Sequence, residues 1–321
     1  MNGWTPRIAL CPPEGWPEAL AVLYRRVPAS IRSRLVEDAI AEQARGEVDL
    51  SGLWVARRGR RMIGALLTQP LAGRAAAVWP PEVDAAWGRA GIAAGLVRQA
   101  LGHLRARGCL LAQALLDEST PRQAAADLTA GGMPRVTELL YLEGDTRAEV
   151  PLRPDTPVLD WRSFSAETEA EIRDVLSRTY QGSLDMPELE GLRSLDDVLG
   201  GHRAAGRFIP ERWRIGRVRG EPEASALVLL SEMADRDAWE VAYLGLTPAA
   251  RGRGIGRAAL AHAVELARPH VSRIELAVDL RNHPAHHLYR AAGFRPFDRR
   301  AVHLASFGST NPTSVPQPGR T

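Results

Sequence analysis

The feature that most constrains the fold of this chain is an order of strand and helix patterns that occurs twice. In each half, apolar runs typical of strands lead through a glycine-containing turn into a helix pattern, and a strand, a short helix and a last strand follow. Residues 88–101 can be superposed on 251–264, which aligns Gly91 with Gly254. The repeated order predicts an α/β protein of two successive units, each a mixed sheet with helices on both faces.

Polar, proline-containing segments indicate where these units begin and end. The chain has 321 residues, which is enough for two domains of average size. Residues 145–156 are typical of a linker, so we expect a first domain over 1–144 and a second over 157–307. The polar segment 308–321 is expected to be a disordered tail.

Composition argues against several functional classes. All 41 basic residues are arginine, so no lysine is available as a Schiff base or general base. The arginines are spread among 38 acidic residues rather than clustered with aromatic residues, which argues against nucleic-acid binding. No apolar run approaches the ~20 residues of a spanning helix, no signal-peptide pattern opens the chain, and Cys11 and Cys109 are too few for a disulfide framework or metal cluster. We expect a cytoplasmic monomer or homodimer without metal, nucleic acid or membrane partners.

A glycine-rich segment, RGRGIG at 251–256, separates a strand pattern from a helix pattern. The first N–H groups of a helix lack partners within the helix and, together with the helix dipole, attract phosphate. Glycine lets a diphosphate approach the backbone closely, and the spacings of the dinucleotide and P-loop motifs are absent. The pattern therefore favours a diphosphate cradle, with a simple tight turn as the alternative. The predicted cradle residues are Arg251, Gly252, Arg253, Gly254, Ile255, Gly256 and Arg257.

Two motifs together resemble the GCN5-related N-acetyltransferase (GNAT) family. The family's coenzyme A loop, [RQ]-x-x-G-x-[GA], has its counterpart at 251–256, and its second signature, Asn-x-x-Ala-x-x-Leu-Tyr-x-x-x-Gly-Phe, at 282–294. The resemblance covers 157–306 well and 7–143 as a degenerate copy. It implies two tandem GNAT-type domains. The loop region is also similar to that of the mycothiol synthases, a tandem branch of the family that acts on an amino-sugar thiol precursor.

The resemblance implies direct transfer of an acetyl group from acetyl-CoA to the amine of a small molecule or peptide. It places Glu240 as the general base and Tyr289 beside the CoA sulfur as the proton donor to the leaving thiolate. The backbone of Leu244 and Leu246 would bind the thioester carbonyl, and Asn282 would contact the pantetheine arm or cap the following helix. Taken alone, Glu240 is equally a solvated strand-end acid and Tyr289 a packed helix aromatic.

The first copy lacks the side chains to which the resemblance assigns chemistry. The superposed pairs are Gly88 with Arg251, Ala77 with Glu240, and Leu128 with Tyr289. The first domain is therefore predicted to be noncatalytic, with CoA binding or a wall of the acceptor pocket left open as its role.

Two questions stay open at the level of the sequence. A noncatalytic module that binds or senses acetyl-CoA is the alternative to an enzyme. Residues 180–192, which the resemblance places over the acetyl end of CoA, contain Asp185, Glu188 and Glu190 and no basic residue. Such a segment favours a cationic acceptor, unless it is merely a solvated loop.

Overall fold

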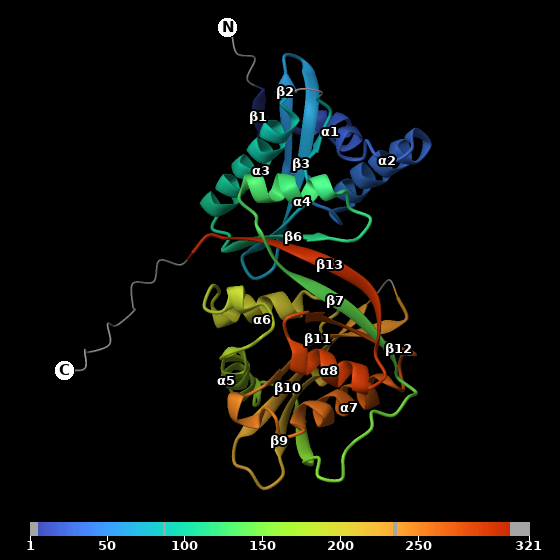
Figure 1. The fold of residues 1–321 in the computed structure, drawn as a ribbon, viewed down its shortest axis with the longest axis vertical. Helices are drawn as coiled ribbons and strands as arrows, with labels where there is room; N and C mark the ends of the chain where they lie inside the picture. Colours follow the sequence, from blue (N-terminus) through green and yellow to red (C-terminus); the bar gives the residue numbers. More distant parts are fainter. Residues whose placement is uncertain (1–5, 86–87, 234–235, 309–321) are drawn as a thin grey trace, which may run out of the picture.

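The fold is built on one continuous mixed sheet. A computed structural model describes residues 6–85, 88–233 and 236–308. Across these ranges the strands form a 13-stranded sheet in the order β1-β2-β3-β4-β6-β13-β7-β12-β11-β10-β9-β8, with β5 paired to β3 (Figure 1). The predicted α/β fold with a mixed sheet is confirmed. The predicted tail 308–321, apart from Gly308, lies outside the described residues.

The described residues of the N-terminal half, 6–85 and 88–145, form seven strands and four α-helices. The strands are β1 (Arg7–Leu10), β2 (Leu53–Arg58), β3 (Arg61–Leu71), β4 (Ala75–Val78), β5 (Glu82–Val83), β6 (Leu111–Leu116) and β7 (Arg135–Asp145). The helices are α1 (Trp16–Leu23), α2 (Ala29–Arg45), α3 (Arg89–Ala106) and α4 (Arg122–Gly131). Helices α1 and α2 pack on one face of the sheet and α3 and α4 on the other, because alternate residues of a strand point to opposite faces.

The C-terminal half, residues 157–308, repeats this arrangement. Its strands are β8 (Leu159–Ser163), β9 (Trp213–Val218), β10 (Ala224–Met233), β11 (Ala238–Leu246), β12 (Arg273–Asp279) and β13 (Arg295–Ser306). Its helices are α5 (Glu169–Tyr180), α6 (Leu195–Arg203), α7 (Ile255–Ala267) and α8 (His283–Ala291). Helices α5 and α6 cover one face and α7 and α8 the other.

The last strand of each half pairs with the other half. Strand β7 lies between β12 and β13, with Leu142 opposite Leu276 and Pro296, and β13 lies between β6 and β7. Figure 1 shows these two strands side by side where the halves meet. The side chain of Leu142 is fully buried in the core beneath α7 and α8. A strand of the N-terminal half is thus part of the hydrophobic core of the C-terminal half.

The structure corrects one detail of the sequence superposition. Helix α3 begins after Gly88 and helix α7 after Gly254, and both glycines have left-handed backbone conformations, with φ of 71° and 80°. Gly91 lies inside α3. The structural counterpart of Gly254 is therefore Gly88, because Gly88 lies 11 positions after Ala77, whereas Gly254 lies 14 positions after Glu240. The pairing of Ala77 with Glu240 holds, since each is the last residue of a three-residue parallel ladder.

The pairing of β7 with β12 and β13, which we call the strand exchange, leads to a stability prediction. Leu142→Ala should lower the free energy of unfolding by about 2–5 kcal/mol, the usual range for a fully buried leucine. Leu152→Ala is the control; this side chain is 54% exposed, and its loss should change stability by no more than about 0.5 kcal/mol. Chemical denaturation measures both values. Equal, small effects of the two substitutions would contradict the shared core.

Candidate active site

Two parallel strands separate at the centre of the C-terminal half. Strands β11 and β12 pair only from Ala238 to Glu240 on one side and from Arg273 to Glu275 on the other. Beyond this point β12 pairs with β7 as far as Asp279, while β11 continues to Leu246 along β10. A bulge leaves Ala242 without a partner in the β10 ladder. The edge of β11 that contains the predicted residues Leu244 and Leu246 is therefore open toward β12.

The glycine-rich segment lies at the end of this open edge. Gly252 and Gly254 have φ of 75° and 80°, conformations that side chains with a Cβ rarely adopt. Among the described residues, no backbone carbonyl accepts a hydrogen bond from the amides of 252–256. A Cβ on Gly256 would lie 3.4 Å from side-chain atoms of Leu246 and Leu288. The segment thus brings α7 close to β11 and leaves the amides available for an anion.

The three arginines of the segment are tied to neighbouring parts of the chain. Arg251 donates hydrogen bonds to the carbonyls of Thr179 and Gly182, both at 3.0 Å, just where α5 ends. Arg253 forms an ion pair with Glu221. Arg257 donates to the carbonyl of Pro151 at 2.9 Å. Their predicted role as extra charge beside a phosphate stays a prediction, and the structure adds that they hold the segment in place.

Glu240 is half-buried at the point where β11 and β12 separate. Burial raises the pKa of its carboxyl, the Arg236 guanidinium opposes this shift, and the Glu275 carboxylate adds to it. Within the described residues, the Glu240 carboxylate accepts no hydrogen bond and forms no ion pair of 4.0 Å or less. A carboxylate with a raised pKa and no partner is better suited to act as a general base than an ordinary surface carboxylate.

Tyr289 lies on α8, with its ring packed 6.0 Å from that of Phe294. The side chain is 7% exposed, and its hydroxyl makes no hydrogen bond within the described part of the chain. Burial raises its pKa, and the Asp185 carboxylate and Tyr243 raise it further. The phenol therefore stays protonated at neutral pH and has a proton to donate. The ring is packed, as one alternative expected, while the hydroxyl is unpaired.

Asn282 caps a helix in this structure. Its side-chain oxygen accepts a hydrogen bond from the backbone N–H of Ala285 at 3.3 Å, at the start of α8. This is the capping alternative of the two that the sequence left open. A contact with a pantetheine arm stays a prediction.

A cluster of aromatic residues beside the site was not foreseen from the sequence. Tyr180 and Tyr243 stack with their ring centroids 5.4 Å apart, and His202 lies 5.1 Å from Tyr243. The Tyr180 hydroxyl is 3.1 Å from His202 Nε2, and the Tyr243 hydroxyl is 2.8 Å from that of Thr179. Burial lowers the pKa of His202 to about 4 and raises that of Tyr243 to about 12. Tyr180, the first residue of the segment 180–192, and Tyr243, which directly precedes Leu244, are close enough in sequence to predicted residues to have been noticed, whereas His202 is not.

In the N-terminal half, an arginine–aspartate pair joins α3 and α4, the helices that correspond to α7 and α8. Arg89, the first residue of α3, donates two hydrogen bonds of 2.9 and 2.7 Å to the Asp127 carboxylate on α4. The Asp127 side chain is buried. The guanidinium thus joins the start of α3 to α4, whereas in the C-terminal half Ile255 begins α7 and Leu288 lies on α8.

Two surface hollows are lined by other residues than the candidate catalytic ones. One, of about 470 Å³, lies over β7, β13 and the segment after β6, and the other, of about 320 Å³, adjoins Thr137 and Arg281. Among the described residues, no group of three or more His, Cys, Asp or Glu side chains is placed to hold a metal ion. No helix in the described ranges is long and apolar enough to span a membrane.

Comparisons with known proteins agree with this geometry. Residues 187–294 match the model of the acetyltransferase (GNAT) family. A mycothiol acetyltransferase from Beutenbergia cavernae is 31% identical over 205 residues, which are 58% of this chain and 63% of that protein. The chain thus spans less than two thirds of the curated relative that it matches.

Solved structures show the same fold. A GCN5-related N-acetyltransferase from Sphaerobacter thermophilus has a TM-score of 0.59 at 17% identity, covering 94% of this chain and 95% of that one. The glucosamine N-acetyltransferase region of a fungal multi-domain β-N-acetylglucosaminidase has a TM-score of 0.60 at 15% identity, covering 94% of this chain and 38% of that one. Residues 187–294 therefore match the model of the acetyltransferase (GNAT) family, and the described chain has the fold seen in the GCN5-related N-acetyltransferases.

Proposed function

We propose that this protein is an N-acetyltransferase that moves an acetyl group from acetyl-CoA directly to an amine. The observation that carries the proposal is the open edge of β11, which has a glycine segment with free amides at one end and Glu240 at the other. The free amides are suited to bind the CoA diphosphate. The backbone of Leu244 and Leu246 is suited to bind the pantetheine arm and the thioester carbonyl.

The two candidate catalytic residues fit the two proton transfers of this reaction. The amine nitrogen attacks the thioester carbonyl carbon, a C–N bond forms, and the proton of the amine passes to the Glu240 carboxylate. The C–S bond then breaks, and the Tyr289 hydroxyl gives its proton to the departing sulfur. The raised pKa of Glu240 favours uptake of the amine proton, and the raised pKa of Tyr289 keeps the phenol protonated until the sulfur departs.

We infer that catalysis belongs to the C-terminal half, over 157–307, and that the N-terminal half, over 1–144, is noncatalytic. Ala77 and Leu128 stand where the acidic and phenolic groups would be required. The Arg89–Asp127 pair also joins α3 to α4. The corresponding helices of the C-terminal half, α7 and α8, have apolar side chains at these positions. The N-terminal half supplies β7 to the shared sheet. The two free cysteines fit the reducing cytoplasm that we propose as its location.

The acceptor follows less directly from the comparisons. The curated relative is a mycothiol acetyltransferase, and the region matched in the fungal protein acts on glucosamine. We therefore include amino sugars and their thiol-bearing derivatives, beside simple and peptide amines, among the acceptors to be assayed.

A matched pair of glycine substitutions tests CoA binding. Gly254→Val should raise the dissociation constant for CoA by ~10-fold or more, because a side chain would cover the free amides. Gly88→Val is the control, since Gly88 also begins a helix in a left-handed conformation and carries the same backbone strain. Isothermal titration calorimetry gives both constants. Equal weakening by the two substitutions would contradict a C-terminal cradle.

Substitution of the two candidate catalytic residues tests the chemistry. Tyr289→Phe should lower kcat by about 10²–10⁴-fold with little change in the KM for acetyl-CoA. Wild-type rates should fall as the pH drops below the raised pKa of Glu240, because the base must be unprotonated, and Glu240→Gln should remove this acidic limb. Release of CoA thiol with an amine panel measures the rates, and Glu265→Gln on the exposed side of α7 is the control. Wild-type pH profiles in both variants would show that the roles are misassigned.

A further inference from the structure

The two candidate catalytic residues lie on opposite faces of the sheet. Glu240 is opposite Ser231 in the β10 ladder. Ser231 alternates along β10 with Leu229 and Leu227, whose side chains pack beneath α5 and α6, so Glu240 projects to that face. Tyr289 belongs to the core on the face of α7 and α8. In the proposed reaction, an acceptor amine that reaches Glu240 therefore approaches from the face of α5 and α6.

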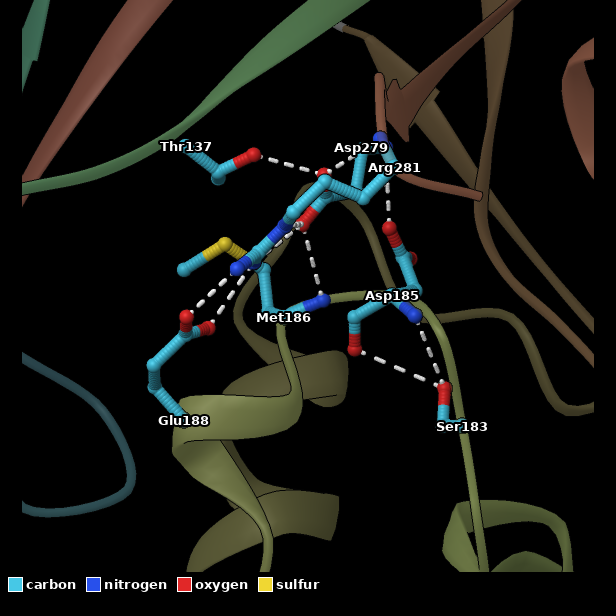
Figure 2. Close-up of polar contacts among 7 residues, drawn as sticks. All are labelled: Thr137, Ser183, Asp185, Met186, Glu188, Asp279 and Arg281. Atoms are coloured by element: carbon cyan, nitrogen blue, oxygen red, sulfur yellow. Dashed lines mark hydrogen bonds and ion pairs between the residues drawn. The ribbon is translucent and has the colours of Figure 1, made fainter. Parts of the chain in front are cut away.

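The segment 180–192 crosses this face from β11 to β12. At its start, the Tyr180 ring stacks on that of Tyr243 on β11, with the ring centroids 5.4 Å apart, and both pack with the core beneath α5 and α6. Further along, the backbone N–H of Met186 donates a hydrogen bond of 3.2 Å to the carboxylate of Asp279, the last residue of β12 (Figure 2). Both contacts lie beyond the part where β11 and β12 are paired, so the segment passes over the opening between the strands.

The end of the segment near β12 is held by charged, polar and apolar contacts. Arg281 donates hydrogen bonds of 2.6 and 2.9 Å to Glu188 and forms an ion pair with Asp279 (Figure 2). The Thr137 hydroxyl, on β7, donates to the Asp279 carboxylate at 2.6 Å, and both side chains are buried. Leu189 packs against a buried cluster formed by β4, β6 and β13. The N-terminal half thus helps to hold this end of the segment.

The end of the segment near β11 is held by Arg251, the first residue of the glycine-rich segment. The Arg251 guanidinium donates hydrogen bonds of 3.0 Å to the carbonyls of Thr179 and Gly182. Within the described residues, no backbone N–H donates to either carbonyl, because α5 ends here and its last carbonyls lack partners in the helix. A cation at this end of a helix also offsets the helix dipole. Arg251 therefore fixes the point where α5 passes into the segment 180–192.

These contacts give Arg251 a place on both substrate sides. Its backbone begins the glycine-rich segment, whose free amides are suited to bind the CoA diphosphate. Both terminal nitrogens of its side chain, Nη1 and Nη2, donate to the carbonyls at the end of α5. The side chain thus joins the predicted CoA cradle to the segment that an approaching acceptor meets.

We propose that Arg251 is a positioning residue for the acceptor, which holds the segment 180–192 over the opening between β11 and β12, and that its charge contributes little to CoA binding. The inference rests on the proposed acetyl transfer. It moves the side chain of Arg251 from the CoA side of the site, where the sequence motif places it, to the acceptor side.

Substitution of Arg251 separates the two roles. The acceptor is the amine with the highest kcat/KM in a panel of glucosamine, 1,4-diaminobutane and a peptide with a free amino terminus. Arg251→Met should raise the KM for this acceptor by ~10-fold with little change in kcat, because the hydrogen bonds to the segment are lost. The dissociation constant for CoA, from isothermal titration calorimetry, should change by no more than about twofold. Arg251→Lys should restore only part of the acceptor KM, because an ammonium group lacks the fork that reaches both carbonyls.

Hydrogen–deuterium exchange checks the physical cause without an acceptor. Backbone amides of 180–192 should exchange faster in Arg251→Met than in the wild-type protein, while thermal melting shows that the fold is intact. Unchanged exchange together with a raised dissociation constant for CoA would assign the guanidinium to the phosphates and overturn the inference.

Arg253→Met is the control with the same loss of charge in the same glycine-rich segment. Arg253 pairs with Glu221 and, in the described part of the chain, donates to no residue of 180–192, so any effect should fall on CoA binding and not on the acceptor KM. An unchanged acceptor KM in Arg251→Met, or an equal rise in Arg253→Met, would overturn the inference while the enzyme stands. Absence of CoA release with every amine in the panel would instead overturn the proposed function.

Discussion

The backbone pairing of β7 between β12 and β13 is the interaction on which the rest of the structure depends. It joins the two halves into one sheet, buries Leu142 beneath α7 and α8, and places Thr137 beside Asp279. It also occupies the edge of β12 that faces away from β11. From Arg273 to Glu275, β12 therefore pairs with β11 on one edge and with β7 on the other, and from there to Asp279 it pairs with β7 alone. The candidate active site thus opens one strand away from a strand of the N-terminal half.

The same pairing gives the N-terminal half a structural role in the C-terminal half. The N-terminal half has no acid or phenol at the positions that count, and the start of α3 is joined to α4 by Arg89 and Asp127. Its contribution is structural. Thr137 on β7 donates a hydrogen bond to Asp279 at the end of β12, and Asp279 in turn accepts one from the backbone of Met186 in the segment 180–192.

Much of the fold and part of the site could be predicted from local sequence patterns. Periodicity and the order of elements indicated the α/β units. The glycine-rich motif indicated the loop at 251–256, and the second motif, at 282–294, indicated Tyr289, because each pattern is contained in a short segment. The exchange of β7 and β13 was not foreseen, since both strands have ordinary alternation and nothing local specifies a partner. The aligned position of Gly91 was wrong because a difference in loop length has no sequence signal. The hydrogen bonds of Arg251 and Asp185 could not be predicted either, because they join segments far apart in the chain.

The exchange also has a consequence for biosynthesis. Strand β6 has β13 as its neighbour, and β13 begins only at Arg295. On the ribosome, the N-terminal half therefore emerges with one side of β6 uncovered and with β7 lacking both neighbours, and it waits in this state until almost the entire described chain has been made. Uncovered strand edges attract other chains. Vectorial synthesis thus leaves the strand edges of this protein exposed to aggregation for longer than those of two independent domains would be.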